Sequence, residues 1–185
     1  AISRSDRELV QCCLRGDKEA FTELARSHSG RLYAIAYGKL SSHQEAEDIV
    51  QDTLVFAYQR LGQLRQPDSF RAWVSRIAVR LSDDRGKKRR REMVDDLRQH
   101  IEEAPDPVIQ QEQFVHDEDV RQVVSRALAI MPESLRVAVA MRYMGHASYE
   151  EIAETLGVSR RSAETYVTRG KNQAREYLTR SGRAD

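Results

Sequence analysis

The sequence has few of the features that mark membrane, secreted or β-rich proteins. No stretch approaches the roughly 18 consecutive apolar residues of a membrane span, and the N-terminus has no secretory cleavage pattern. Its two cysteines, Cys12 and Cys13, are adjacent, a spacing that suits neither a disulfide nor a metal site. Because alternating β-branched residues are almost absent, strands are not expected. These absences predict an all-α protein of the reducing cytoplasm.

Groups arranged for catalysis or for holding a metal or cofactor are also lacking. The histidines are scattered along the chain and show neither ligand nor triad spacing: His28, His43, His100, His116 and His146. The tightest acidic clusters are explained by solvated helix faces and a charged linker. We therefore expect no enzyme, no metal, no cofactor and no small-molecule substrate.

Apolar residues recur at helical spacing in both halves of the chain. One such face runs from Ala46 to Leu61 and another from Phe70 to Leu81, and the pattern restarts at Val120 and ends before Pro132. Between the halves, residues 92–119 contain ten acidic residues, two prolines and a single arginine, a net charge of −9. The sequence predicts two small helical domains, residues 1–91 and 120–185, joined by a flexible acidic linker over residues 92–119.

Residues 71–91 form a strongly basic segment with nine basic and two acidic residues, a net charge of +7. This density indicates a polyanion partner, and nearby Phe70 and Trp73 suit stacking on unpaired bases. Two alternatives stay open: a solvated helix end whose charge complements the macrodipole, and a core position for Trp73 beside Ile77. The acidic linker could cover this segment when no nucleic acid is bound, although a linker that only keeps the chain soluble is the simpler interpretation.

Residues 148–170 have the pattern of a helix-turn-helix. Ser148 and Glu151 form a capping box, Gly157 suits the left-handed end of the first helix, and Ser159 caps the second. Ile152, Ala153 and Leu156 face inward. The second helix then presents a polar face suited to reading the major groove, made by Ser159, Arg160, Arg161, Ser162, Glu164, Thr165, Thr168 and Arg169.

In this order, the motifs resemble the extracytoplasmic-function group of bacterial RNA polymerase sigma factors over nearly the whole chain. The segments that carry the resemblance are GDKEAFTEL (16–24), AEDIVQDTL (46–54), FRAWVSRIA (70–78), ALAIMPESLR (127–136) and SYEEIAETLGVS (148–159). The resemblance implies a protein with no catalytic site that binds core RNA polymerase and promoter DNA, with an anti-sigma factor as a further partner.

The resemblance also implies roles for individual residues. Glu47, Asp48, Gln51 and Asp52 would contact polymerase, and the second domain's polar face would read the −35 element. The −10 element would be held by Phe70, Arg71, Trp73, Arg76, Arg80, Asp84, Lys87, Lys88, Arg89 and Arg90.

The chain departs from the family pattern at three places. Arg80 stands where the family commonly has asparagine, and Glu164 where it often has a basic residue. Around Asp84 the usual apolar residues are replaced by Asp83, Arg85 and Gly86, which predicts an early end to this helix. A stand-alone helix-turn-helix regulator would explain only the second domain, and a scaffold binding protein through both domains is a second alternative.

Overall fold

The computed structural model describes residues 4–100 and 120–181, and within these ranges all regular structure is helical. The predicted all-α fold is confirmed. The N-terminal half contains α1 (Asp6–Leu14), α2 (Lys18–Leu40), α3 (His43–Arg60) and α4 (Phe70–His100), with two short 3₁₀ turns, Leu61–Gln63 and Pro67–Ser69, before α4. The C-terminal half contains α5 (Val120–Ala129), α6 (Glu133–Tyr143), α7 (Tyr149–Leu156) and α8 (Arg160–Ser181).

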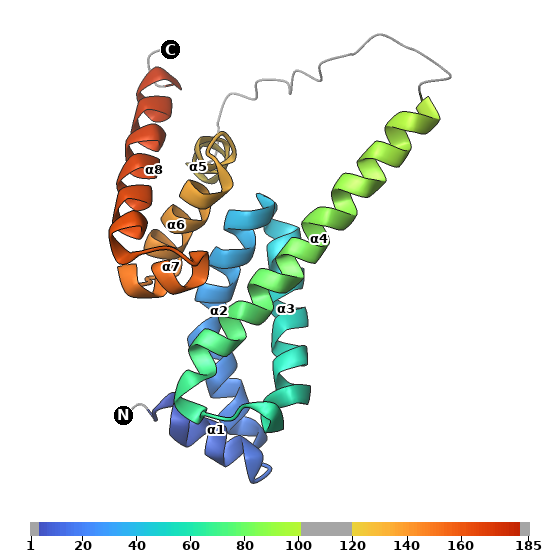
Figure 1. Cartoon of the computed structure of the whole chain (residues 1–185), viewed down its shortest axis with the longest axis vertical. Helices are drawn as coiled ribbons and strands as arrows, with labels where there is room; N and C mark the ends of the chain where they lie inside the picture. Colours follow the sequence, from blue (N-terminus) through green and yellow to red (C-terminus); the bar gives the residue numbers. More distant parts are fainter. Residues whose placement is uncertain (1–3, 101–119, 182–185) are drawn as a thin grey trace.

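Helix α2 is central to the N-terminal half and packs against α1, α3 and α4 (Figure 1). Ser5, Asp17 and Ser42 each accept a backbone N–H from the first turn of α1, α2 and α3, which satisfies donors that have no partner inside the helix. Large apolar side chains such as Leu24 and Ile35 are fully buried between these helices. The result is a helical bundle from which the far end of α4 projects.

The predicted early end of the basic helix is wrong, because α4 continues through Asp83, Asp84, Arg85 and Gly86 to His100. Gly86 is buried, and a β-carbon at this position would lie 3.8 Å from the Leu40 side chain. Asp83 binds Lys39 of α2 at 2.8 Å, so this segment is held by tertiary contacts. Packing of this kind overrides weak local helix propensity.

The two halves pack directly on one another, with α6 lying along α2 (Figure 1). Gly38 permits this approach, because a β-carbon there would lie 2.7 Å from the Cα of Val137. The Arg136 Nε donates to the Gly38 carbonyl at 2.6 Å, close to the end of α2. One continuous apolar cluster includes Leu32 of α2 and Met141 of α6, so the halves share a core.

The predicted linker, residues 92–119, falls largely outside the described residues; its first nine residues belong to the end of α4. The interpretation in which the linker covers the basic segment therefore lies outside the described part of the chain. The domain boundaries stay a prediction.

Candidate nucleic-acid interface

The local geometry of the helix-turn-helix is as predicted. Ser148 accepts the Glu151 N–H at 3.2 Å and the Glu151 carboxylate accepts the Ser148 N–H at 2.7 Å, which completes the capping box of α7. Gly157 ends α7 with φ of 65°, a left-handed conformation that favours glycine. Ser159 then accepts the Ser162 N–H at 3.1 Å at the start of α8. The angle between α7 and α8 therefore depends on three local features: the capping box of α7, the left-handed Gly157 and the Ser159 cap of α8.

The inward face of this motif is buried as the spacing predicts. Ile152 and Ala153 of α7 are buried together with Ala163 and Val167 of α8, while Leu156 is half-buried. Gly170 faces α6, where an added β-carbon would overlap the Val139 side chain. The core positions thus fix α8 against both α6 and α7.

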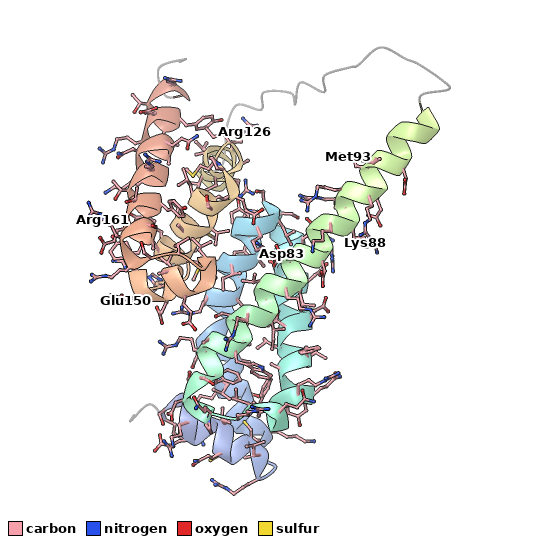
Figure 2. The ribbon with its side chains drawn as sticks, viewed as in Figure 1. Asp83, Lys88, Met93, Arg126, Glu150 and Arg161 are labelled. Carbon is pink, nitrogen blue, oxygen red and sulfur yellow. The ribbon has the colours of Figure 1, made fainter. Side chains whose placement is uncertain are left out.

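The predicted reading face of α8 is largely exposed. Figure 2 shows Arg161 and Glu150 on the side of the C-terminal half that faces away from α4. Arg160 lies 2.8 Å from the Glu150 carboxylate and 3.3 Å from that of Glu164, so Glu164 neutralises a neighbouring base in this structure. The other exposed members of the predicted face are Ser159, Arg161, Thr165, Thr168 and Arg169, and Ser162 and Glu164 are half-buried. This face is suited to DNA without rearrangement.

The basic residues of α4 divide between different sides of the helix. Four of them, Arg71, Arg76, Arg80 and Lys87, line a cavity of about 250 Å³ between α4, α2 and α7, and the acidic Asp84 lines it as well. Residues 76, 80, 84 and 87 are four, four and three residues apart, which places their side chains on one face of the helix. Asp84 lies 4.0 Å from Arg80, an i, i+4 pair. The structure therefore brings five of the predicted −10 residues together.

The other predicted basic residues lie elsewhere on α4. Arg89 donates to the Leu40 carbonyl at 3.2 Å and to Glu45 at 2.8 Å, which anchors α4 to α2 and α3. Lys88 lies 3.7 Å from Glu92, and Figure 2 shows it on the projecting part of the helix. Arg90 lines a shallow depression on that part with Lys87 and Arg91.

The prediction that Phe70 stacks on DNA bases is at odds with the structure. Phe70 is fully buried, with its ring 5.3 Å from His28 and 6.0 Å from Trp73. Burial of apolar surface stabilises the fold, so the Phe70 side chain at the start of α4 lies in the core. Trp73 is half-buried against the same core, which favours the core alternative left open by the sequence.

The predicted polymerase-facing residues of α3 share one exposed surface. Ala46, Ile49 and Thr53 are buried, whereas Glu47, Asp48, Gln51 and Asp52 are exposed. Arg85 of α4 lies 3.7 Å from both the Asp48 and the Asp52 carboxylates. Sequence reasoning missed this pairing, because nothing in the local pattern brings residue 85 beside residues 48 and 52.

Sequence reasoning also missed Arg31, and it missed that Glu151 forms ion pairs with the N-terminal half in addition to capping α7. Arg31 of α2 lies 2.8 Å from the Glu151 carboxylate, and Arg71 of α4 lies 2.6 Å from the same oxygen, Oε1. Burial opposes ionisation of Glu151, but the hydrogen bonds from Arg31, the Ser148 backbone and Arg71 outweigh it. They lower the pKa of Glu151 to about 2. Only the capping role of Glu151 left a sequence signal.

Two family profiles match the chain, one in each half. Residues 24–92 match the family described as sigma-70 region 2, and residues 121–173 match sigma-70 region 4. Among the part of the chain that the structure describes, no helix is long and apolar enough to cross a membrane.

Curated relatives carry the same kind of description. The chain is 32% identical over 168 residues to the ECF RNA polymerase sigma factor SigE of Mycolicibacterium smegmatis, a match that covers 89% of this chain and 65% of that protein. It is 25% identical to the ECF RNA polymerase sigma factor SigW of Bacillus subtilis, covering 89% of this chain and 91% of that protein.

Solved structures show the same architecture. The sigma factor RpoE of Bartonella quintana, in complex with the anti-sigma factor NepR, aligns with a TM-score of 0.65 at 25% identity over 87% of this chain and 98% of that chain. CnrH, in complex with the cytosolic domain of CnrY, also aligns with a TM-score of 0.65, at 24% identity, over 94% of this chain and 97% of that chain.

Proposed function

This chain belongs to the sigma-70 family of RNA polymerase sigma factors, in its extracytoplasmic-function group, and on this premise we propose that it binds core polymerase and directs transcription initiation. It recognises the −10 and −35 promoter elements and performs no catalysis of its own. The observation that carries the proposal is the presence, in one chain, of a basic face on α4 and an exposed helix-turn-helix face on α8.

The exposed surface of α3 is the polymerase contact in this proposal. Glu47, Asp48, Gln51 and Asp52 point away from the buried side of the helix. Arg85 partly neutralises Asp48 and Asp52 in the free protein, so a basic partner surface would compete with it for these carboxylates.

The two DNA elements are assigned to the two halves. The exposed polar face of α8 reads −35 duplex in the major groove. The −10 strand follows α4, where Arg71, Arg76, Arg80 and Lys87 offer phosphate contacts and Lys88 and Arg90 extend the positive charge. Packing and ion pairs support this surface through Trp73, Asp84 and Arg89. The buried Phe70 is not part of the proposed DNA contact.

An anti-sigma factor is the remaining proposed partner. The structural relative from Bartonella quintana is seen in complex with one. A cytoplasmic site of action follows from the polymerase partner. No residue of this chain identifies the inducing signal.

A reconstituted transcription assay tests the proposed function. The purified chain is mixed with bacterial core RNA polymerase, and run-off transcripts are collected from a genomic fragment library. Stable association and discrete start sites are the expected result. Absence of association with retained duplex binding would instead favour a stand-alone regulator.

The docking surface has its own test in the same system. Asp48→Arg together with Asp52→Arg is expected to weaken retention of the chain on core polymerase, because both charges of the contact are reversed. Duplex binding by the free chain should stay unchanged, since neither aspartate belongs to the polar face of α8. A parallel loss of duplex binding would contradict this assignment.

A further inference from the structure

We propose that Arg31 and Arg71 form a phosphate-binding pair for the promoter strand, and that Glu151 of the helix-turn-helix occupies this pair when the two halves are packed together. The proposal rests on the proposed function and adds both a DNA-contacting residue, Arg31, and a competitor for it. The ligand is the backbone phosphate of single-stranded DNA.

The geometry around Glu151 is that of an anion bound by two guanidinium groups. Its Oε1 lies 2.8 Å from Arg31 and 2.6 Å from Arg71, which come from different helices of the N-terminal half. The Arg31 side chain is only 11% exposed. Arginine pairs arranged in this way bind carboxylate and phosphate oxygens alike.

The position of the pair connects it to the proposed path of the DNA strand. Arg31 and Arg71 line the same cavity as Arg76, Arg80 and Lys87. From residue 71 to residue 87 the helix rises about 24 Å at ~1.5 Å per residue, enough to follow several nucleotides. The pair therefore lies at one end of a continuous basic row.

Acidic side chains of α7 face this row from the C-terminal half. Glu151 and Glu154 both line the cavity, and residues three apart on a helix have Cβ atoms roughly 5–6 Å apart. Asp83 and Asp84, which also line it, are paired with Lys39 and Arg80. A DNA strand must displace Glu151 of α7 to reach Arg31, whereas the Arg71 side chain is 52% exposed and is occupied only by its ion pair with Glu151.

The contact between α2 and α6 holds α7 in this position. Gly38 lies against the Val137 backbone, Arg136 donates to the Gly38 carbonyl, and Lys39 binds Glu133 at 2.7 Å. Separation of the halves thus requires loss of apolar packing as well as the two ion pairs of Glu151. In the proposal, binding of a phosphate between Arg31 and Arg71 and packing of Glu151 against them are therefore mutually exclusive.

Two variants of the full chain are designed to free Arg31 and Arg71 from Glu151 in different ways. Glu151→Gln removes the charge but keeps the capping box, which accepts glutamine at this position. Gly38→Ala is expected to displace α6 from α2, because its β-carbon would lie 2.7 Å from the Val137 Cα, while alanine favours the helix itself. The matched controls are Glu176→Gln on α8 and Gly30→Ala on α2, where an added β-carbon meets nothing within 4 Å.

The measurement is the affinity of each variant for a short fluorescein-labelled single-stranded DNA, by fluorescence anisotropy over a range of salt concentrations. Glu151→Gln and Gly38→Ala are each expected to tighten binding roughly threefold to tenfold, the range of a partly buried ion pair. The controls should bind as the wild type does. Equal gains in Glu151→Gln and Glu176→Gln would overturn the proposal, because net charge alone would then explain both.

Arg31 is tested in the Gly38→Ala background. Arg31→Gln should reduce the salt slope by about 0.7, the value for one phosphate contact to a single strand, and Arg31→Lys should restore it. An unchanged slope in Arg31→Gln would overturn the role of Arg31. The run-off assay of the wild type does not depend on these outcomes, so failure of this inference is distinguishable from failure of the proposed function.

Discussion

The two helices that we propose to bind DNA differ in how their basic residues are paired. On α8, Arg161 and Arg169 are exposed and the reading face points away from the other half. On α4, the basic row begins at Arg71, which is bound to Glu151 of the facing half. Under the proposed function, duplex can be read by α8 at once, whereas Arg31 and Arg71 become available to a strand only after Glu151 leaves them.

The largest expected effect comes from reversing the charge of the α4 row. Arg76→Glu, Arg80→Glu and Lys87→Glu together should lower promoter opening by on the order of a hundredfold, because several phosphate contacts become repulsive. Retention of the chain on core polymerase should change little, since α3 is untouched. Permanganate reactivity of promoter DNA measures opening, and co-elution with polymerase measures retention.

A matched triple variant controls for net charge. Arg15→Glu, Lys18→Glu and Arg26→Glu alter exposed bases of the N-terminal half outside the α4 cavity. This variant should open promoters nearly as well as the wild type. Equal loss of opening in both triples would remove the distinction between the row and the remaining surface.

The α8 face should show the next largest effect, and without any need to separate the halves. Arg161→Ala with Arg169→Ala is expected to weaken −35 duplex binding by roughly tenfold to a hundredfold, as for lost base or phosphate contacts. Gly38→Ala should leave duplex affinity unchanged. Arg175→Ala with Arg180→Ala, at the exposed far end of α8, provides the control. A gain in duplex affinity on Gly38→Ala would show that α8 is also covered.

The helix-turn-helix could be predicted nearly completely because its determinants are local. Ser148, Glu151, Gly157 and Ser159 act within four residues of their partners, so the sequence alone specifies the caps and the turn. The acidic face of α3 was equally predictable from the buried positions between its charges. In both cases periodicity decides which side chains face outward.

The remaining features depend on contacts between distant segments. The pairs Arg85–Asp48 and Arg31–Glu151 join residues that no periodicity relates. The early helix end was wrongly predicted because the burial of Gly86 on α2 is invisible in the local pattern. Phe70 shows the same limit, since an aromatic beside a basic run suits a core and a DNA surface equally well.

The turn at Gly157 tests whether the helix-turn-helix holds α8 in the orientation that binds duplex. Gly157→Ala places a β-carbon in a left-handed conformation at a cost of roughly 1–2 kcal/mol. Thermal unfolding should shift down by about 2–8 °C, and duplex binding should weaken as α8 loses its fixed angle. Gly30→Ala, within α2, should leave both unchanged or slightly raise the midpoint. Intact duplex binding in a destabilised Gly157→Ala variant would show that the turn does not position α8.

The smallest expected effect is the pH dependence of the Glu151 contact. The pKa of Glu151 is lowered from its ordinary value of 4.5 to about 2, so its ion pairs stabilise the packed halves above pH 4.5. That contribution is lost as the pH falls from 4.5 through 2. The unfolding midpoint of the wild type should therefore exceed that of Glu151→Gln by about 2–4 °C, constant from pH 8 to about 5 and shrinking below that.

The shape of this pH profile separates Glu151 from the other titratable groups. His28, which is buried in the N-terminal half, is bound to Asp6 in the wild type and in the variant alike. Subtracting the Glu151→Gln midpoint from the wild-type midpoint removes such contributions, because both proteins retain them. A difference that already shrinks between pH 7 and 6 would contradict this assignment, because a Glu151 carboxylate with a lowered pKa stays ionised throughout that range.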